Sequence, residues 1–549
     1  MKKMRSYKNI LAVATLAAMV LSSCQKDSDF LKETQKDALN TNNALLNKAQ
    51  FVELMGSMYQ GVQKMYNSAD GVQDAFILGL GTDVCFDPRD DANSYNNWSL
   101  VNTVEPYSAN WFNLQYGTFL KVANTVIAGA DNPAVTWASD AEKNAIVGEA
   151  RFFRAFAYRN LANVYGGVPI VDKPTTTPRF DYSRSTRDQV WKFAKDDLEF
   201  ARTWLPATTT SPGRVVRAAA DHLLAEIDIS LKDYDGAIAA ATRVIDGTDG
   251  TYSLVKARFG ARATEANKDY YWDLFVMGNQ NTQAGNNEGI WVAQFEPVIP
   301  GGTVNFNRPL IERMMWCSYW SMAKFGYKAL AVDSTGRGVA FVRGTNYVNY
   351  DIWNNDPGDI RNNETNIKRN YYFGPTSPAA PYHPGDLIPR SFLTLREDTM
   401  SYIYPNWQKF GTDKHINAQP DNGYIRDFYV MRLPETYLLR AEAHLGKGET
   451  QLAASDINVV RERAQAPDVA AADVTLDYIL DERARELYGE EFRMLTLGRL
   501  GLIYQRTKDH GYKASATSIQ SFNNLLPIPQ TVIDLNSQAP MDQNPGYTK

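Results

Sequence analysis

The chain has 549 residues but only three cysteines and five histidines. Cys24, Cys85 and Cys317 lack the short spacings of a zinc site or of a disulfide framework. None of the histidines stands in the H-E-x-x-H pattern of zinc hydrolases. We therefore expect no metal centre and no cofactor. Cys85 and Cys317 could pair in an oxidising compartment, but we expect two buried free thiols, because unpaired cysteine packs like a small apolar residue.

An excess of charge of one sign is also missing. The 57 basic residues nearly balance the 62 acidic ones. A nucleic-acid partner held by phosphate neutralisation is therefore not expected. The glycine-rich fingerprints of phosphate-binding loops are absent too, because residues 79–81 lack the third glycine and residues 446–448 lack the full P-loop spacing.

Only one apolar run stands out, and it lies at the start of the chain. Residues 10–21 are apolar and follow four basic residues, but the run is too short to span a bilayer in the mature protein. Leu21-Ser22-Ser23-Cys24 follows directly and resembles the lipobox of bacterial lipoproteins. We expect residues 1–23 to be a lipoprotein signal, Cys24 to carry the lipid and residues 24–43 to form a polar tether.

Helical periodicity dominates the body, which we place at residues 44–549. Residues 148–169 carry aromatic residues on two lines of one helix, so this helix has neighbours on two sides, and the glycines and proline at its end stop it. Two units of helix, tight turn and helix look like tetratricopeptide pairs and should stack on one core. The predicted helices are 44–66, 111–128, 140–165, 188–205, 215–231, 236–245, 434–445, 449–464 and 475–500.

The periodicity is lost between the two helical parts, which we place at about 44–250 and 430–500. Residues 251–430 are rich in glycine, proline, asparagine and aromatic residues, which are turn signals. Long ordered loops usually carry function, so we expect this region to face a ligand. The last segment, 520–549, contains several prolines and should be extended.

Several motifs together resemble the SusD/RagB family of outer-membrane lipoproteins. The blocks follow in the family's order: the lipobox at Cys24, GEARFFRA running to YGGVP at 148–169, NVVRERA at 458–464, DERAREL at 481–487, LPIP at 526–529 and QNPGY at 543–547. The resemblance covers nearly the whole chain. It implies a mostly α fold, with a helical body of tetratricopeptide-like pairs and an irregular loop-rich region.

The resemblance also implies a function without catalysis. Such a protein would sit at the cell surface, anchored in the outer membrane through the lipid on Cys24. It would capture a glycan and deliver it to a SusC-like, TonB-dependent barrel. Peptide capture, as in the RagB branch, is a second hypothesis, and a glycosidase is a third.

Glycan capture requires flat aromatic faces and fixed polar groups, and two loop segments offer them. Trp98 is the first candidate, because its sequence neighbours are polar. Tyr350 belongs with the aromatic residues of the second segment. The other candidates are Asp83, Arg89 and Asn96 in the first segment, and Trp316, Tyr319, Trp320, Tyr347 and Trp353 in the second.

A glycosidase would need two carboxylates in one cleft. Glu486, Glu490 and Glu491 lie on the charged segment 481–493 and offer carboxylates. Alternating charges on a helix usually form a solvated or ion-paired face, and we expect that arrangement here.

Overall fold

The computed structural model describes residues 45–66, 79–296, 302, 310–328, 336, 338–376, 380–411 and 426–547. The expected signal segment, Cys24 and the tether lie outside the described residues. Residues 47–549 group into one compact unit. None of the described helices is long and apolar enough to cross a membrane.

Helix α7 (Asp140–Tyr165) is the long central helix that the sequence predicts. It begins where the Ser139 hydroxyl accepts a hydrogen bond from the backbone N–H of Glu142, 3.2 Å away. It ends at Gly166, whose φ of +75° lies in the left-handed region that glycine adopts without strain. The predicted burial of its aromatic residues is confirmed for Phe152, Phe153 and Phe156.

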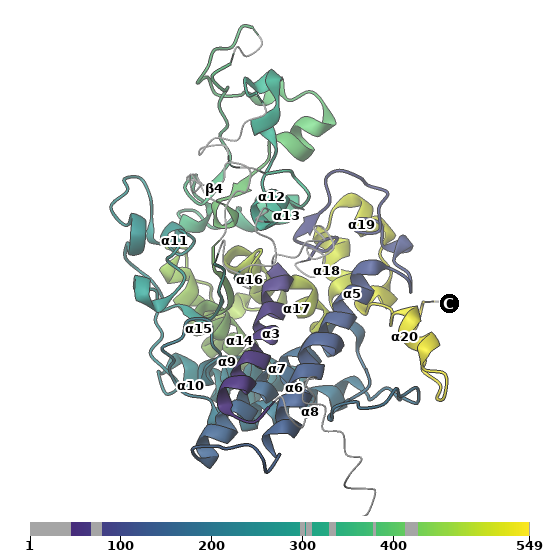
Figure 1. Cartoon of the computed structure of the whole chain (residues 1–549). Coiled ribbons are helices and arrows are strands. Elements are labelled where there is room, and N and C mark those ends of the chain that lie inside the picture. Colours follow the sequence, from purple (N-terminus) through teal and green to yellow (C-terminus); the bar gives the residue numbers. More distant parts are fainter. Residues whose placement is uncertain are drawn as a thin grey trace, which may run out of the picture. The chain divides into compact units, whose positions relative to one another are not determined.

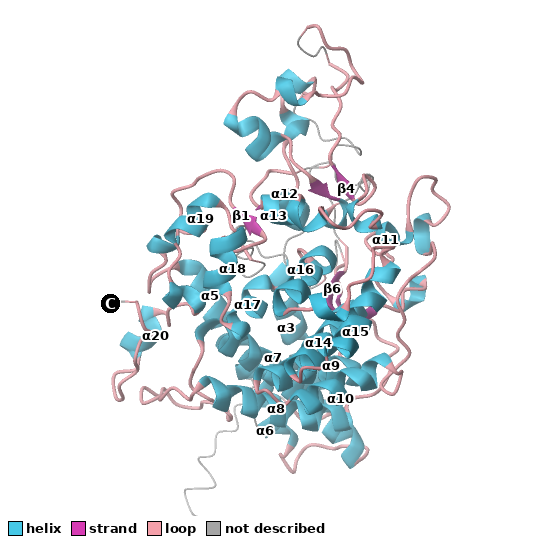
Figure 2. Ribbon diagram, turned by 180° about the vertical axis from the view of Figure 1, so that it is seen from behind, coloured by secondary structure: helices cyan, strands magenta, loops and turns pink. Residues whose placement is uncertain are grey.

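The helices that follow α7 in the body each pack against a neighbouring helix, and Figures 1 and 2 show them side by side. The first predicted helix pair packs against the second, through contacts of α14 with both α9 and α10. The prediction that the early and late pairs share one core is therefore confirmed. The elements are α8 (Arg187–Trp204), α9 (Arg217–Ser230), α10 (Tyr234–Ile245), α14 (Leu433–Gly446) and α15 (Thr450–Arg463).

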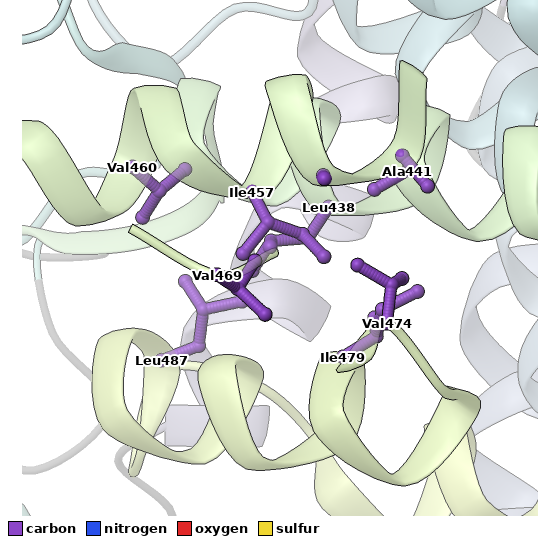
Figure 3. Packing of buried hydrophobic residues seen from close by; sticks show 10 residues of the cluster. Leu438, Ala441, Ile457, Val460, Val469, Val474, Ile479 and Leu487 are labelled. Carbon is purple, nitrogen blue, oxygen red and sulfur yellow. The ribbon is translucent and has the colours of Figure 1, made fainter. Parts of the chain in front are cut away.

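The late helix pair has its own apolar cluster, which Figure 3 shows from close by. Leu438 of α14 and Ile457 of α15 are fully buried in it, together with Ile479 of α16 (Leu476–Leu487). Complete burial of such a side chain stabilises the fold by about 1.5–3 kcal/mol. The third helix thus covers the face that the pair cannot bury by itself.

The predicted single helix over 475–500 is wrong. Its start is as predicted, because the Thr475 hydroxyl accepts a hydrogen bond from the Tyr478 N–H at 3.1 Å. The helix stops at Leu487, however, and α17 (Arg493–Leu500) begins only after a break. Gly489 lies in this break with a φ of +74°, outside the helical region. The charged pattern continues across the break, so periodicity did not reveal it.

The other helices flank this body. Residues 115–120 form a π-helical turn between α5 and α6, within the stretch predicted as one helix. The elements are α3 (Lys48–Tyr66), α5 (Pro106–Leu114), α6 (Lys121–Ala130), α18 (Ile503–His510), α19 (Lys513–Ser518) and α20 (Gln530–Leu535). The mostly α fold class is confirmed.

The described part of 251–430 has only short elements. Three two-stranded antiparallel sheets join distant segments: β1 with β3, β2 with β6, and β4 with β5. Trp291 on β2 packs its ring edge-on against three phenylalanines of α7, which fixes this region to the helical body. The elements are β1 (Cys85–Phe86), α11 (Tyr270–Asp273), β2 (Gly289–Ala293), α12 (Leu310–Met315), β3 (Arg343–Gly344), α13 (Asn346–Asn349), β4 (Ile367–Lys368), β5 (Asn406–Trp407) and β6 (Phe428–Arg432).

The C-terminal segment was expected to be extended, but it contains the short helix α20. Its last residues close over the end of α7. The Asn544 side chain donates to the carbonyl oxygens of Tyr165 at 2.9 Å and Leu526 at 2.7 Å. Arg184 donates in turn to the Asn544 amide oxygen at 2.6 Å. Three of the sequence blocks named above therefore meet at one place.

Candidate functional site

The first predicted segment, residues 83–98, is held mainly by buried contacts. Asp83 is fully buried and lies 2.6 Å from Arg493 Nη2 and 3.1 Å from Arg506 Nε. Burial would raise the pKa of Asp83, but the two arginines hold it well below its usual range. Asp83 therefore anchors the loop and does not face a ligand.

Trp98 is buried, and the expectation that it is an exposed platform is wrong. Its exposed fraction is 2%, and its indole N–H donates to the Gly81 carbonyl oxygen at 2.8 Å. Asn96 is also buried, and its amide bonds the backbone of Asp87. The polar sequence neighbours of Trp98 misled the prediction, because a polar neighbour does not ensure exposure: Ser99 is exposed, but Asn96 is as buried as Trp98. Of the candidates in this segment, only Arg89 is exposed.

Most aromatic candidates of the second segment are buried too. The Trp316 indole donates to the Trp407 carbonyl oxygen at 2.8 Å, and Tyr319 belongs to a buried aromatic cluster. Trp320 is half-buried and donates to the Gly338 carbonyl oxygen at 2.6 Å. Exposed aromatic faces at Trp316 and Tyr319 are therefore excluded by their packing.

The structure does bring the two predicted segments together. Strand β1 pairs with β3, so Phe86 lies opposite Arg343. The Arg506 side chain donates to the Tyr347 hydroxyl at 2.5 Å and also pairs with Asp83. Tyr347 is 4% exposed and hydrogen-bonds Asp481 as well. It therefore holds the two segments in place and does not face a ligand.

One pocket in this region has the polarity of a sugar site. It has a volume of about 340 Å³ and lies around the turn that follows Trp353. Trp353 lines the pocket but is only 6% exposed, so little of its side chain is accessible there. Amide side chains supply both donors and acceptors there. We call this the Trp353 pocket, and its lining includes Trp353, Asn354, Gly358, Asn362 and Asn363.

A cluster of arginine and tyrosine side chains lies on neighbouring loops. The Arg343 guanidinium lies over the rings of Phe86 and Tyr404, 5.7 and 5.6 Å from their centroids. The ring of Phe86 stacks on that of Tyr512, with 4.0 Å between centroids. Tyr350 is 42% exposed. We call this the Arg343 cluster; its members are Phe86, Arg343, Tyr404 and Tyr512.

Arg369 connects the pocket with the cluster. Its guanidinium donates to the backbone and side-chain oxygens of Asn362, at 3.1 and 2.6 Å, and to the Asn349 carbonyl oxygen at 3.0 Å. Tyr350 follows Asn349 directly and interacts electrostatically with both Arg369 and Arg343.

The three glutamates that a glycosidase would use for acid–base chemistry all form ion pairs. Glu486 lies 2.6 Å from Arg432 and 3.0 Å from Arg361, and it also pairs with Arg463. Burial would raise the pKa of Glu486, but these arginines hold it well below its usual range. The expected ion-paired face is confirmed, although it is buried and not solvated. Glu490 pairs with Lys409 and Arg432, and Glu491 with Arg483.

Arg343 and Tyr512 were not among the predicted residues. Nothing in the sequence distinguishes them from the other arginines and tyrosines. The distinguishing property of Arg343 is its surroundings, which only the folded chain reveals. Tyr350 was noted in the sequence, and it is the exposed member of its aromatic group.

Two family models match this chain. One, described as "Starch-binding associating with outer membrane", matches residues 29–228, and the other, described as "SusD family", matches residues 343–547. The chain belongs to the SusD/RagB family. These matches leave out residues 229–342 but include the Trp353 pocket and the Arg343 cluster.

Relatives agree with this assignment along most of the chain. "SusD-like protein P2" of Formosa agariphila is 24% identical, with 82% of this chain and 83% of that protein covered. A SusD-like protein of Bacteroides ovatus is 25% identical, with coverages of 72% and 67%.

Solved structures show the same fold. A "Laminarin binding SusD-like protein" has a TM-score of 0.66 at 22% identity, covering 91% of this chain and 100% of its own. "Surface glycan-binding protein A" of Bacteroides fluxus has a TM-score of 0.66 at 19% identity, with coverages of 91% and 100%. The SusD-like fold is therefore established for this chain.

Proposed function

We propose that this protein is a non-catalytic glycan-binding lipoprotein of the cell surface, and that it passes an oligo- or polysaccharide to a SusC-like, TonB-dependent transporter. The observation that carries the proposal is the Trp353 pocket beside the exposed Tyr350. Amide groups bond the hydroxyl groups of a sugar, and an exposed tyrosine ring packs against its C–H face. Relatives described as glycan-binding share the fold and support this ligand class.

A glycan suits the site better than a peptide does. Peptides commonly bind as an added strand along an exposed sheet edge. Near the pocket and the cluster, strands β1, β3, β4 and β5 are only two residues long, so they offer little edge. Peptide capture remains the second hypothesis, and binding of peptide mixtures with sugars inert would decide for it.

The carboxylates of the pocket do not favour hydrolysis. Asp356 lies 2.5 Å from Arg461 and 2.8 Å from Arg485, while Asp359 lies 2.7 Å from Arg361. Both carboxylates are held in these ion pairs, so neither is free to act on a bound sugar. A glycosidase would release reducing ends from a polysaccharide; a flat time course with purified protein is expected.

Calorimetric titration tests the glycan site directly. The panel begins with starch and laminarin, the glycans in the descriptions of the matching family and of one related structure. Tyr350→Ala should weaken binding about 2- to 10-fold, since an aromatic contact contributes about 0.5–1.5 kcal/mol. Asn354→Ala should weaken it as well, because Asn354 is exposed and lines the pocket.

Tyr372→Ala is the matched control. Tyr372 is 49% exposed but lies outside the pocket and the cluster. Its loss should leave binding unchanged. An equal effect of Tyr350→Ala and Tyr372→Ala would contradict the site, and no binding to any glycan would contradict the glycan function.

Anchoring and delivery need separate tests. Cys24→Ser should move the protein from the membrane fraction to the soluble fraction, since the acyl chains supply the anchor. A tagged protein should co-purify with a TonB-dependent barrel from detergent-solubilised outer membranes. Retention of the Cys24→Ser variant in membranes would contradict lipid anchoring at this residue.

A further inference from the structure

The end of helix α15 lies against the Trp353 pocket and brings Gln465 next to it. The backbone N–H of Ile360, which lines the pocket, donates to the Ala464 carbonyl oxygen at 2.9 Å. A Cβ atom at Gly358, another lining residue, would lie 3.7 Å from the Gln465 carbonyl oxygen. Gln465 itself is exposed. Its side chain is therefore accessible beside the pocket.

Gln465 also has an uncommon backbone conformation. Its φ of +57° lies in the left-handed region that favours glycine. The helix ends here in a Schellman motif, in which the Ala466 N–H donates to the Arg461 carbonyl oxygen at 2.9 Å. Helix α14 has Gly448 at the corresponding position. Lys232, after α9, shares the conformation of Gln465, so the conformation alone does not mark a site.

The contacts of its side chain distinguish Gln465 from Lys232. The Gln465 Nε2 donates to the Tyr270 hydroxyl at 3.2 Å, and this hydroxyl donates to the Arg463 carbonyl oxygen at 2.7 Å. The Gln465 Oε1 accepts no hydrogen bond from a described residue. The amide is thus held on one side and keeps an acceptor available for a hydroxyl group.

Tyr270 adjoins the same pocket. The side chain of Asn363, a lining residue, donates to Asp269 Oδ2 at 2.9 Å, and Asp269 directly precedes Tyr270. The Tyr270 ring is half-buried and packs against the apolar cluster that contains Ile360. Its hydroxyl is fixed by two hydrogen bonds. The ring is therefore held in place while part of it stays accessible.

The size and charge of the pocket indicate what kind of glycan it suits. Its volume of about 340 Å³ lies at the lower end of the range of about 300–1,000 Å³ for small-ligand pockets, so a long glycan must extend beyond it. None of the described residues that line it is basic. Its two aspartates, Asp356 and Asp359, are already paired with arginines. Such a lining suits a neutral sugar better than an anionic one.

We propose that Tyr270 and Gln465 form a second sugar subsite beside the Trp353 pocket, and that the site takes a neutral oligosaccharide longer than the pocket itself holds. The amides of the pocket bond the first part of the ligand. The next unit packs against the accessible part of the Tyr270 ring, and the Gln465 Oε1 accepts a hydrogen bond from one of its hydroxyl groups. The inference rests on the proposed function and narrows its substrate class.

Calorimetric titration with fragments of defined length tests the subsite. The probes are maltooligosaccharides and laminarioligosaccharides of two to six units; where another glycan of the panel binds, its own fragments of these lengths are added. At least one series should bind the wild type about tenfold more tightly at four units than at two, because the longer chain gains an aromatic contact and a hydrogen bond. This gain should persist in high salt, since no charge takes part.

Gln465→Gly separates a binding role from a structural one. Glycine adopts the left-handed conformation without strain, so the melting temperature should stay close to that of the wild type. The four-unit fragment should bind about 2- to 10-fold more weakly, whereas the two-unit fragment should bind as before. A side chain that only supports the turn would give the reverse, a lower melting temperature and an unchanged dependence on length.

Lys232→Gly is the matched control. Lys232 is exposed and occupies the same position of a Schellman motif, but it does not line the pocket. Its substitution should change the melting temperature as little as Gln465→Gly does and leave binding of every fragment unchanged. Tyr270→Ala should remove most of the length gain, and Tyr270→Phe should keep the part that the ring supplies.

The outcomes separate the two proposals. Affinity that does not rise with length, or a rise that survives both Gln465→Gly and Tyr270→Ala, overturns the subsite and leaves glycan binding standing. Failure to bind any glycan of the panel or any fragment overturns both. If Tyr270→Ala does not fold, Gln465→Gly decides alone. An equal loss of affinity in Lys232→Gly would show that relaxing such a turn, and not losing the amide, weakens binding.

Discussion

Two regions of this protein use arginine in opposite ways. In one region, a buried network joins arginines to glutamates, and each arginine of this network pairs with at least one carboxylate. In the Arg343 cluster, the Arg343 guanidinium lies over two aromatic rings, and no carboxylate of the described residues lies within 4.0 Å of it. We call the first set the arginine–glutamate network; its members are Glu288, Arg361, Arg432, Arg463, Glu482 and Glu486.

The difference separates the roles of the two regions. The network ties α15 and α16 to strand β6 and to Glu288, which directly precedes β2, so its charges are satisfied within the fold. The Arg343 guanidinium has no carboxylate of the described residues within 4.0 Å, which costs stability. The network therefore contributes ion pairs to the fold, and the Arg343 cluster contributes aromatic packing.

The largest effect should come from breaking the network. Glu486→Gln removes the charge that Arg361, Arg432 and Arg463 share. Leaving buried cations uncompensated should lower the free energy of unfolding by about 5 kcal/mol. Chemical denaturation followed by far-ultraviolet circular dichroism would measure this change. Glu397→Gln, at an exposed carboxylate, is the control and should be close to wild type.

Trp98→Ala should rank next. The indole is buried and hydrogen-bonded, so its loss leaves a cavity and an unpaired Gly81 carbonyl. The expected loss of stability is about 3–4 kcal/mol, the opposite of the unchanged melting temperature expected of an exposed platform. Thermal unfolding would measure it. Tyr350→Ala, at an exposed aromatic residue, should unfold like the wild type.

A fall in pH should destabilise the arginine–glutamate network but not the Arg343 cluster. Burial would raise the pKa of Glu482, but Arg361, Arg485 and Arg461 lower it to about 2. Its unfolded pKa is about 4.3, so the carboxylate stabilises the fold above that pH and loses this contribution as the pH falls towards 2.

Denaturation at about pH 5 and about pH 3 would test this. The wild type should lose more stability between the two values than Glu482→Gln does. Arg343→Gln should lose as much as the wild type, because the Arg343 cluster contains no carboxylate. Equal losses in wild type and Glu482→Gln would show that Glu482 does not titrate with the low pKa.

The smallest effect on stability should come from the cluster itself. Arg343→Gln removes a half-buried charge that no carboxylate of the described residues pairs with, so its free energy of unfolding should stay within about 1 kcal/mol of the wild type or rise. Chemical denaturation would measure it beside Arg463→Gln, which should be strongly destabilised. A large loss in Arg343→Gln would show that this arginine supports the fold.

The helical part of the fold was predictable because it depends on local periodicity. Helix α7 follows from its cap, its apolar spacing and Gly166. The break at Gly489 could not be predicted in the same way. The surrounding residues keep a helical pattern, and contacts with distant segments, not local periodicity, make the chain turn there. The meeting of residues 83–98 with 343–353 depends on β1 and β3, which are too short to recognise in sequence.

The candidate site was much less predictable. Trp98 and Tyr350 have similar polar neighbours in sequence, yet one is buried and the other exposed. Burial of an aromatic ring depends on which segments fold over it, and the sequence of one loop does not contain this information. The lack of a counter-charge at Arg343 likewise depends on every surrounding segment.

The closure of α7 by the last residues of the chain has a consequence for how the protein is made. Asn544 bonds Tyr165 across 379 positions of sequence. Synthesis proceeds from the N-terminus, so the end of the central helix lacks this partner until residue 544 has been made. Contacts this distant in sequence form slowly. A chain truncated before residue 544 should therefore stay open at this place and be cleaved by proteases more readily than the wild type.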